Sequence, residues 1–357
     1  MEKKLLLISF MFVLGSILGA CATKTPVPEP PLAFEIPDKE LPLSVFGPYE
    51  YSKIYKLDYI DSQRDNREVS ISIYYPSIDD QPDVRGAPFP LIISDSKMAS
   101  KFGDQLSSHG FIVAGVKMPL NFSEGDEVIH QPLDFIFVLN QLTENPPDAL
   151  NGLIDTDHVG HWGYSGGGRI SLTLAGAQID TNFYFEYCQN PENFEINYGE
   201  NNLEWMCEPY ENWDELIEEA GNLFVNAEDG LWKSIKDDRI LATIPMSSGG
   251  KWLFGPKGLA QVDKAVLVTA GTNENEAARY DDCYSTFEEL GTSQKAFISF
   301  VDQDHMMINS QKPNEQMRHL AIAFFTFHLK GKKEYRQYFS QDYISQIEGL
   351  AWGWYEE

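Results

Sequence analysis

Basic residues are scarce in this chain. The 27 Lys and Arg residues stand against 54 Asp and Glu residues, which gives a formal net charge of -27 at pH 7. A surface with this excess of negative charge repels nucleic-acid phosphates and anionic lipid headgroups. We therefore expect no nucleic-acid partner.

Metal-ligating side chains are also sparse. The chain has four Cys and seven His among 357 residues, and none of them cluster at the spacings that hold zinc. We expect no metal and no cofactor. There is no internal repeat either, and 43% hydrophobic residues suffice for one large core. This composition predicts a single domain with insertions.

An apolar run long enough to span a bilayer is missing as well. The longest candidate, Leu5 to Leu18, is shorter than the roughly 20 residues that a span requires, but with Lys3 and Lys4 before it the run suits a signal peptide. It ends in Leu18-Gly19-Ala20-Cys21, which resembles the bacterial lipobox. We expect residues 1–20 to be removed and Cys21 to carry lipid; the alternative is a plain secretory signal with an incidental Cys.

The residue after Cys21 bears on localisation. In lipoproteins of this kind, Ala rather than Asp at that position, here Ala22, is usual for sorting to an outer membrane. We expect an exported protein, lipid-anchored to the bacterial cell envelope, at the outer membrane if the organism is Gram-negative. Residues 21–48 are rich in proline, which suits an extended spacer, and residues 49–357 form the expected domain.

Strand and helix patterns alternate through that domain. Val69 to Tyr75 alternates apolar and polar residues, as a half-buried antiparallel strand does. Later apolar runs indicate buried parallel strands, separated by segments with helical spacing. The runs are Leu91–Ser94, Phe111–Val116, His158–Tyr164, Ile240–Met246, Ala265–Ala270 and Ala296–Val301; the helical segments are Lys101–His109, Pro132–Leu142, Gly168–Gln178, Glu276–Leu290 and Glu315–Leu329. This order predicts an α/β fold with a doubly wound, mostly parallel sheet.

The stretch from Asp180 to Asp238 interrupts the alternation. It combines many aromatic residues with 16 acidic residues and only two basic ones, Lys233 and Lys236. An insertion at this place lies over the carboxyl ends of the strands, where ligands bind in such sheets. We interpret it as a lid; the alternative is a surface insertion unrelated to any site.

The cysteines that remain after lipidation of Cys21 are Cys188, Cys207 and Cys283. Export favours one disulfide and one leftover thiol. Cys188 and Cys207 fall in the same insertion, which favours that pair, and Cys283 stays open as a partner.

The sequence Gly163-Tyr164-Ser165-Gly166-Gly167 fits the G-x-S-x-G pattern. It follows an expected strand and precedes an expected helix, the setting in which this pattern forms a nucleophile elbow. Small flanking residues permit the strained turn, and the following helix N-terminus offers N–H groups to a developing oxyanion. Ser165 is the candidate nucleophile and Gly166 N–H the first oxyanion donor, against a chance Gly-rich turn.

A serine nucleophile needs a base and a group that orients the base. Only His305 lies in a loop after a late strand, at the edge of the sheet where Ser165 emerges. Glu274, in the loop after Ala265–Ala270, is the candidate acid, with Glu276 as runner-up; the alternative is that both balance a helix dipole. The other six histidines are read as structural: His109, His130, His158, His161, His319 and His328.

With these residues in place, the chain resembles the dienelactone-hydrolase-like and platelet-activating-factor-acetylhydrolase-like group of α/β-hydrolases from Tyr55 to Lys330. The resemblance rests on the elbow and on four further segments: Asp61–Pro76, Pro132–Leu142, Asp238–Ile240 and Gly271–Glu274. Members with a Cys pair in this insertion exist, which agrees with pairing Cys188 and Cys207.

The chain departs from the group at two places. Glu274 stands where the group has Asp, and Asp95 to Ser100 replaces a His-Gly pair in the loop that supplies the second oxyanion donor. Alignment with the group puts that donor at Met98 N–H. Glu can play the part of Asp with one more methylene, and a backbone donor survives a change of side chain, so both departures are compatible with activity.

The resemblance implies a serine-dependent carboxylic ester hydrolase acting on a small-molecule or lipid-like ester. In that reading Ser165 attacks, His305 moves the proton, Glu274 orients His305, and Gly166 and Met98 N–H groups hold the oxyanion. The alternative is a catalytically inactive lipoprotein of the same fold that acts as a binding or surface protein. Hydrolysis of amides would use the same groups.

Overall fold

The computed structural model describes residues 29–117, 126–196, 198, 200–220, 229–274 and 279–356. The expected signal peptide, Cys21 and Glu276 lie outside these residues. Within them, no helix is both long and apolar enough to cross a membrane.

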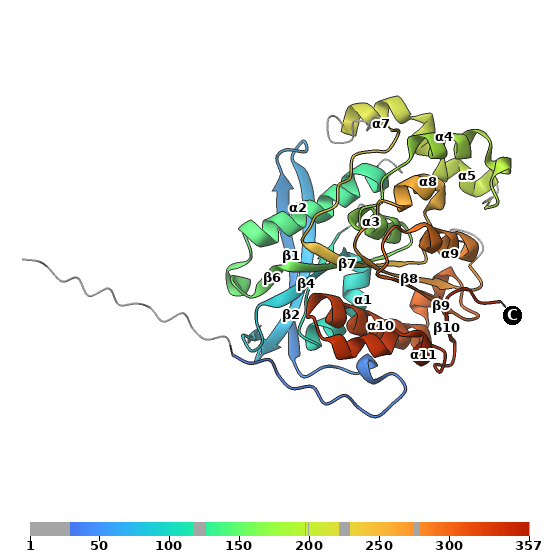
Figure 1. Ribbon diagram of the computed structural model, residues 1–357. Coiled ribbons are helices and arrows are strands. Elements are labelled where there is room, and N and C mark those ends of the chain that lie inside the picture. The colour runs from blue at the N-terminus through green and yellow to red at the C-terminus, as the bar shows by residue number, and fades with distance from the viewer. Residues whose placement is uncertain are drawn as a thin grey trace, which may run out of the picture.

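A mixed sheet of ten strands forms the centre of the described part (Figure 1), in the order β1-β2-β5-β4-β6-β7-β8-β9-β10 with β3 paired to β2. The strands are β1 (Glu50–Asp61), β2 (Arg67–Ile78), β3 (Gln81–Pro82), β4 (Phe89–Asp95), β5 (Ile112–Val116), β6 (Ile154–Tyr164), β7 (Ile240–Met246), β8 (Ala265–Gly271), β9 (Lys295–Phe300) and β10 (Leu350–Trp352). Neighbours from β5 through β4 to β9 pair in parallel. The expected mostly parallel α/β sheet is confirmed.

The outer strands run antiparallel. β2 pairs antiparallel with both β1 and β5, and β10 with β9. The antiparallel strand expected at Val69–Tyr75 is therefore confirmed as part of β2. The sequence pattern did not predict β1, β3 or β10.

Helices cover both faces of the sheet. They are α1 (Ser96–Ser108), α2 (Gln131–Glu144), α3 (Gly166–Leu174), α8 (Lys251–Leu259), α9 (Tyr280–Glu289), α10 (Gln311–Leu329) and α11 (Gln341–Ile344), with 3-10 or π turns η1 (Pro42–Ser44), η2 (Asp126–His130), η3 (Asp148–Leu150), η6 (His305–Asn309) and η7 (Lys333–Phe339). α1 and α10 share one core cluster with Ile92, whereas α2 and α3 pack with Leu91 and Ile93. Because side chains alternate along a strand, these two clusters lie on opposite faces.

The insertion is a helical unit that is closed at its base. It contains α4 (Thr181–Gln189), η4 (Pro191–Asn193), α5 (Glu200–Met206), α6 (Glu208–Glu211) and α7 (Trp213–Ala220). At the base, Asp180 and Leu231 form an antiparallel bridge. The unit packs beyond α3 and α8, where Figure 1 shows α4, α5 and α7 at the outside of the molecule.

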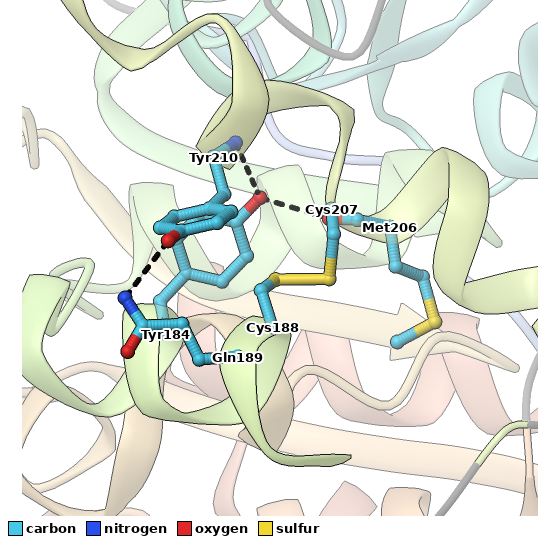
Figure 2. The surroundings of a disulfide bond; sticks show 6 residues. All are labelled: Tyr184, Cys188, Gln189, Met206, Cys207 and Tyr210. Atoms are coloured by element: carbon cyan, nitrogen blue, oxygen red, sulfur yellow. Dashed lines mark hydrogen bonds between the residues drawn. A yellow bond between two sulfur atoms is a disulfide. The ribbon is translucent and has the colours of Figure 1, made fainter.

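A disulfide joins Cys188 in α4 to Cys207 just before α6, as expected, with Cα atoms 5.7 Å apart. Figure 2 shows that Tyr184 supports the same junction: its hydroxyl donates to Met206 O at 2.9 Å and accepts from Tyr210 N at 3.1 Å. Cys283 is a buried free thiol, and its burial raises its pKa.

The segment expected to be a spacer packs on the domain from Glu29 onwards. Leu43 is fully buried, and its N–H donates to His319 Nδ1 at 3.2 Å. The ring of Phe34 lies 4.9 Å from that of His109. Proline disfavours helix in this segment, but its apolar side chains still find core partners. Residues 29–48, which belong to the segment expected to be a spacer, are therefore part of the packed domain.

Candidate active site

Ser165 occupies a strained turn between β6 and α3. Its φ of 57° and ψ of -122° lie in a region that costs a non-glycine residue energy. The turn tolerates no side chain at Gly163, because a Cβ there would lie 1.8 Å from Gly167 O. Ser165 N donates to Met246 O at 2.9 Å, which ties the turn to β7. The hydroxyl is thus presented at the carboxyl edge of the sheet.

His305 approaches Ser165 from the loop after β9. Its Nε2 lies 3.2 Å from Ser165 Oγ. The His305 ring stacks on Tyr164, with centroids 5.0 Å apart, and the Tyr164 hydroxyl donates to His305 O. Burial, together with the negative charges of Glu274 and Asp304, raises the pKa of that phenol. Tyr164 therefore stays protonated and can keep donating this bond.

Glu274 lies behind His305 with a fully buried side chain. Its Oε2 is 3.5 Å from His305 Nδ1, longer than an ordinary hydrogen bond. Its Oε1 accepts from Ser247 Oγ at 2.6 Å and from Gly271 N at 2.8 Å. These two donors orient the carboxylate toward the imidazole. Ser247, whose part in the site no sequence pattern predicted, is fully buried at a φ of 51° after β7.

The structure therefore brings Ser165, His305 and Glu274 together from three separate loops. The hydroxyl, the imidazole and the carboxylate stand in the order that lets an imidazole take a proton from a hydroxyl while a carboxylate orients it.

The expected oxyanion donors differ in their surroundings. Gly166 is the first residue of α3, so its N–H has no partner within the helix. Met98 N–H, by contrast, donates to Asp95 Oδ1 at 3.0 Å. The segment expected to be a loop is the first turn of α1, and Asp95 is its N-cap, also accepting from Lys97 N at 2.9 Å. Met98 N–H is thus not free in this structure.

Asp95 also lies beside the serine turn. A Cβ built on Gly167 would be 3.4 Å from Asp95 Oδ2. Burial raises the pKa of this carboxyl, although the N–H groups of Met98 and Lys97 act in the opposite direction. An Asp directly before a helix is an N-cap signal, so the sequence did carry the information for this start of α1.

A buried ion pair supports the first turn of α3. Arg169 Nη2 donates to Glu127 Oε2 at 2.9 Å, and both side chains are buried. The Arg169 guanidinium also lies 5.4 Å from the ring centre of Trp205 in the insertion and 5.6 Å from that of Trp252. A Cβ on Gly166 would come within 2.6 Å of Glu127 Oε2. No sequence pattern predicted this contact between the insertion and the nucleophile helix.

The insertion also lines a cavity of about 230 Å³. Its walls are mostly aromatic or apolar, with three charged members, Glu195, Lys251 and Asp282; the aromatic ones are Phe183, Tyr187, Phe194 and Trp252. Neither Ser165 nor His305 lines it. Asp282 accepts from the hydroxyl of Tyr198 at 2.7 Å, which fastens the insertion to α9.

Within the described ranges, no group of three or more His, Cys, Asp and Glu side chains could hold a metal ion. No known protein-family profile matches the chain, and no curated protein matches it.

Proposed function

We propose that this protein is a serine-dependent carboxylic ester hydrolase with the α/β-hydrolase fold. The observation that carries the proposal is the contact of 3.2 Å between His305 Nε2 and Ser165 Oγ at a strained turn. A serine hydroxyl on a strand-to-helix turn, paired with an imidazole and a buried carboxylate, is the arrangement that activates serine for acyl transfer.

In the proposed reaction, Ser165 Oγ attacks the ester carbonyl while His305 Nε2 accepts its proton. His305 then protonates the leaving alcohol, and an acyl-enzyme remains on Ser165. Water, deprotonated by His305, attacks this acyl group, and His305 then returns the proton to Ser165 Oγ as the bond to the acyl group breaks and the acid leaves. Glu274 holds the imidazole through Nδ1 and stabilises the imidazolium formed in each half of the reaction.

Gly166 N–H is the proposed first oxyanion donor, because it is a free donor at the N-terminus of α3. For the second donor, Met98 N–H can act only when Asp95 releases it. One such donor is worth about 3 to 4 kcal/mol of transition-state stabilisation. This capped N–H is the one observation that favours the alternative function, an inactive protein of the same fold that binds a ligand.

A fluorophosphonate probe separates the two functions. We expect covalent labelling of the wild-type protein and none of Ser165→Ala, because only an activated serine reacts with the probe. Hydrolysis of p-nitrophenyl esters of graded chain length should follow the labelling. A folded wild-type protein that stays unlabelled and cleaves none of these esters would contradict the proposal and favour a binding role.

We also propose that Cys21 is lipidated and holds the protein at the cell envelope. The support is the lipobox after a charged and then apolar N-terminus. A mass measurement of the mature protein tests this: the expected mass is that of residues 21–357 plus the acyl chains, and Cys21→Ser should abolish the addition.

A further inference from the structure

The point where the described chain begins lies at the amino edge of the parallel strands. Glu29 O accepts from Gly86 N at 3.0 Å, and Gly86 comes just before β4. Leu32 N donates to the Tyr49 hydroxyl, which donates to Arg85 O at 2.8 Å. The first described residues, Glu29 to Leu32, therefore lie beside the start of β4.

The candidate active site lies at the opposite edge. The strand β4 pairs in parallel with β6 from Phe89 to Ser94, and Ser94 lies opposite Trp162. Ser165 comes three residues after Trp162. The five steps from Phe89 to Ser94 and the three from Trp162 to Ser165 make eight. At about 3.3 Å per step, Ser165 lies about 26 Å from the start of β4. Figure 1 shows the blue start of the described chain at the lower left, and α4, α5 and α7 of the insertion at the upper right.

The distance from Cys21 to Glu29 is limited by the chain. Positions 21 and 29 are eight residues apart, and at about 3.5 Å per residue they span at most about 28 Å. With the Ser165 edge against a bilayer, this segment would have to be fully stretched along the flank of the domain, with no length left to pass around it. With the Glu29 edge against the bilayer it needs no stretching, which avoids the loss of chain entropy.

Exposed apolar side chains lie near Tyr49 and Gly86, either in the sequence or across the β1–β2 pairing, and Tyr49 and Gly86 contact Leu32 and Glu29. They are Phe46, Tyr51, Ile78 and Val84, which are 53%, 42%, 44% and 50% exposed; we refer to them as the exit patch. The rings of Phe46 and Tyr51 stack with centroids 5.7 Å apart. Tyr51 pairs with Pro76 in the sheet, and Pro76 O accepts from Asp83 N next to Val84.

We propose that the exit patch rests on the lipid surface to which Cys21 is anchored, so that Ser165 faces away from that bilayer. Aromatic and aliphatic side chains of this kind enter the interface between headgroups and acyl chains. The lipid surface is uncharged or zwitterionic, because the net charge of -27 opposes anionic headgroups and Asp79 and Asp80 lie beside Ile78. This part of the inference rests on the proposed hydrolase activity. If Ser165 faces away from the bilayer, its substrate is an ester that arrives from the aqueous side, and not a lipid of the supporting membrane.

The test uses the acylated full-length protein in phosphatidylcholine vesicles that contain nitroxide-labelled lipid. Cys188 and Cys207 are bonded and Cys283 is buried, so one added cysteine can carry an environment-sensitive fluorophore. Val84→Cys reports on the exit patch, and Ile217→Cys, exposed on α7 of the insertion, is the matched control. We expect at least three-fold stronger quenching at position 84 than at position 217. Equal quenching, or stronger quenching at position 217, overturns the orientation.

Two further arms use the same vesicles. Adding phosphatidylglycerol should weaken quenching at position 84, and an increase overturns the assignment of an uncharged or zwitterionic surface.

The second arm tests the substrate. A water-soluble p-nitrophenyl ester should be cleaved, whereas a fluorogenic phospholipid in the vesicle should not be; cleavage of that phospholipid overturns the substrate assignment. If position 84 is quenched but neither ester is cleaved, the hydrolase proposal fails while the orientation stands. If the mature protein proves to carry no acyl chains on Cys21, it has no lipid tether, and the proposed orientation on the membrane is overturned.

Discussion

The two edges of the sheet use polar groups in different ways. At the carboxyl edge, the His305 ring lies between the Ser165 hydroxyl and the Glu274 carboxylate. The backbone there is strained at both Ser165 and Ser247. At the amino edge, Lys330 Nζ donates to His109 O at 2.6 Å and lies 3.9 Å from the ring centre of Phe111.

This contrast separates chemistry from packing. Burial lowers the pKa of Lys330 to about 7, yet its recorded partners are a carbonyl group and an aromatic ring. His109 likewise contacts a carbonyl, that of Val45, at 2.9 Å. The contact of His109 fastens the N-terminal segment to the domain, and that of Lys330 joins the end of α10 to the end of α1. Side chains that pair with one another, as at the carboxyl edge, can pass a proton.

The largest expected effect is that of Glu274→Gln. An amide cannot stabilise the imidazolium of His305, so kcat for ester hydrolysis should fall by about 10²- to 10⁴-fold. Steady-state kinetics with a p-nitrophenyl ester measure this. Asp302→Asn, an exposed acid in the loop that carries His305, is the matched control and should retain activity. Glu276→Gln should also retain it; a larger loss there than at Glu274 would make Glu276 the acid.

Two glycine substitutions compare the edges directly. Gly166→Ala places a Cβ within 2.6 Å of Glu127 Oε2 at the serine turn, and kcat/KM should fall about 10- to 100-fold as the turn shifts. Gly110→Ala, at a φ of 77° and 3.1 Å from Lys330 Nζ, should lower the free energy of unfolding by about 1–2 kcal/mol. Kinetics and urea unfolding of both variants test the contrast. If Gly110→Ala lowers kcat as much as Gly166→Ala does, the division between catalysis at one edge and packing at the other is wrong.

A smaller loss is expected for Ser247→Ala. The change removes the 2.6 Å hydrogen bond to Glu274 Oε1 and leaves Gly271 N as the recorded donor to that oxygen. A kcat about ten-fold lower with an unchanged KM would fit a positioning residue, since one hydrogen bond to a charged group is worth about 1.5–3 kcal/mol. The pH profile of kcat/KM should shift as well. A changed Tm with unchanged kcat and pH profile would mean that Ser247 only supports packing.

The smallest effect concerns His161, in the middle of β6 between the two edges. Burial lowers its pKa to about 3. The native state therefore keeps it neutral, while the unfolded chain takes up a proton below pH 6.5. Stability is lost as the pH falls from about 6.5 toward 3, by up to about 1.4 kcal/mol per pH unit.

A matched pair in one strand measures this contribution. Between pH 6 and pH 5, His161→Gln should reduce the pH dependence of the unfolding free energy by about 1 kcal/mol per pH unit. His158→Gln should change that slope less than His161→Gln does, because the His158 side chain is 50% exposed and its pair with Asp155 at 2.8 Å is open to solvent. Equal slopes in the two variants would mean that His161 is not the source.

Several features were predictable because they depend on neighbouring residues. The apolar runs located β4 and β7 within two residues of their ends, and glycines around Ser165 located the turn. The N-cap of α1 at Asp95 was also readable but was taken for a loop. The packing of Leu43 on His319 was not predictable, because the two are 276 positions apart and no local pattern joins them.

Periodicity and turn residues thus determined by themselves the antiparallel strand β2, the parallel strands, the helices α1, α2, α3, α9 and α10, and the turn at Ser165, since each depends on interactions within a few residues. The tertiary structure alone decided that Ser247 reaches Glu274, that Arg169 joins Glu127 to Trp205, and that Asp95 takes up Met98 N–H. These contacts depend on the order β4-β6-β7-β8-β9 in the sheet, which brings separate loops to one edge. Strand order is set by the packing of the whole core, and no single segment encodes it.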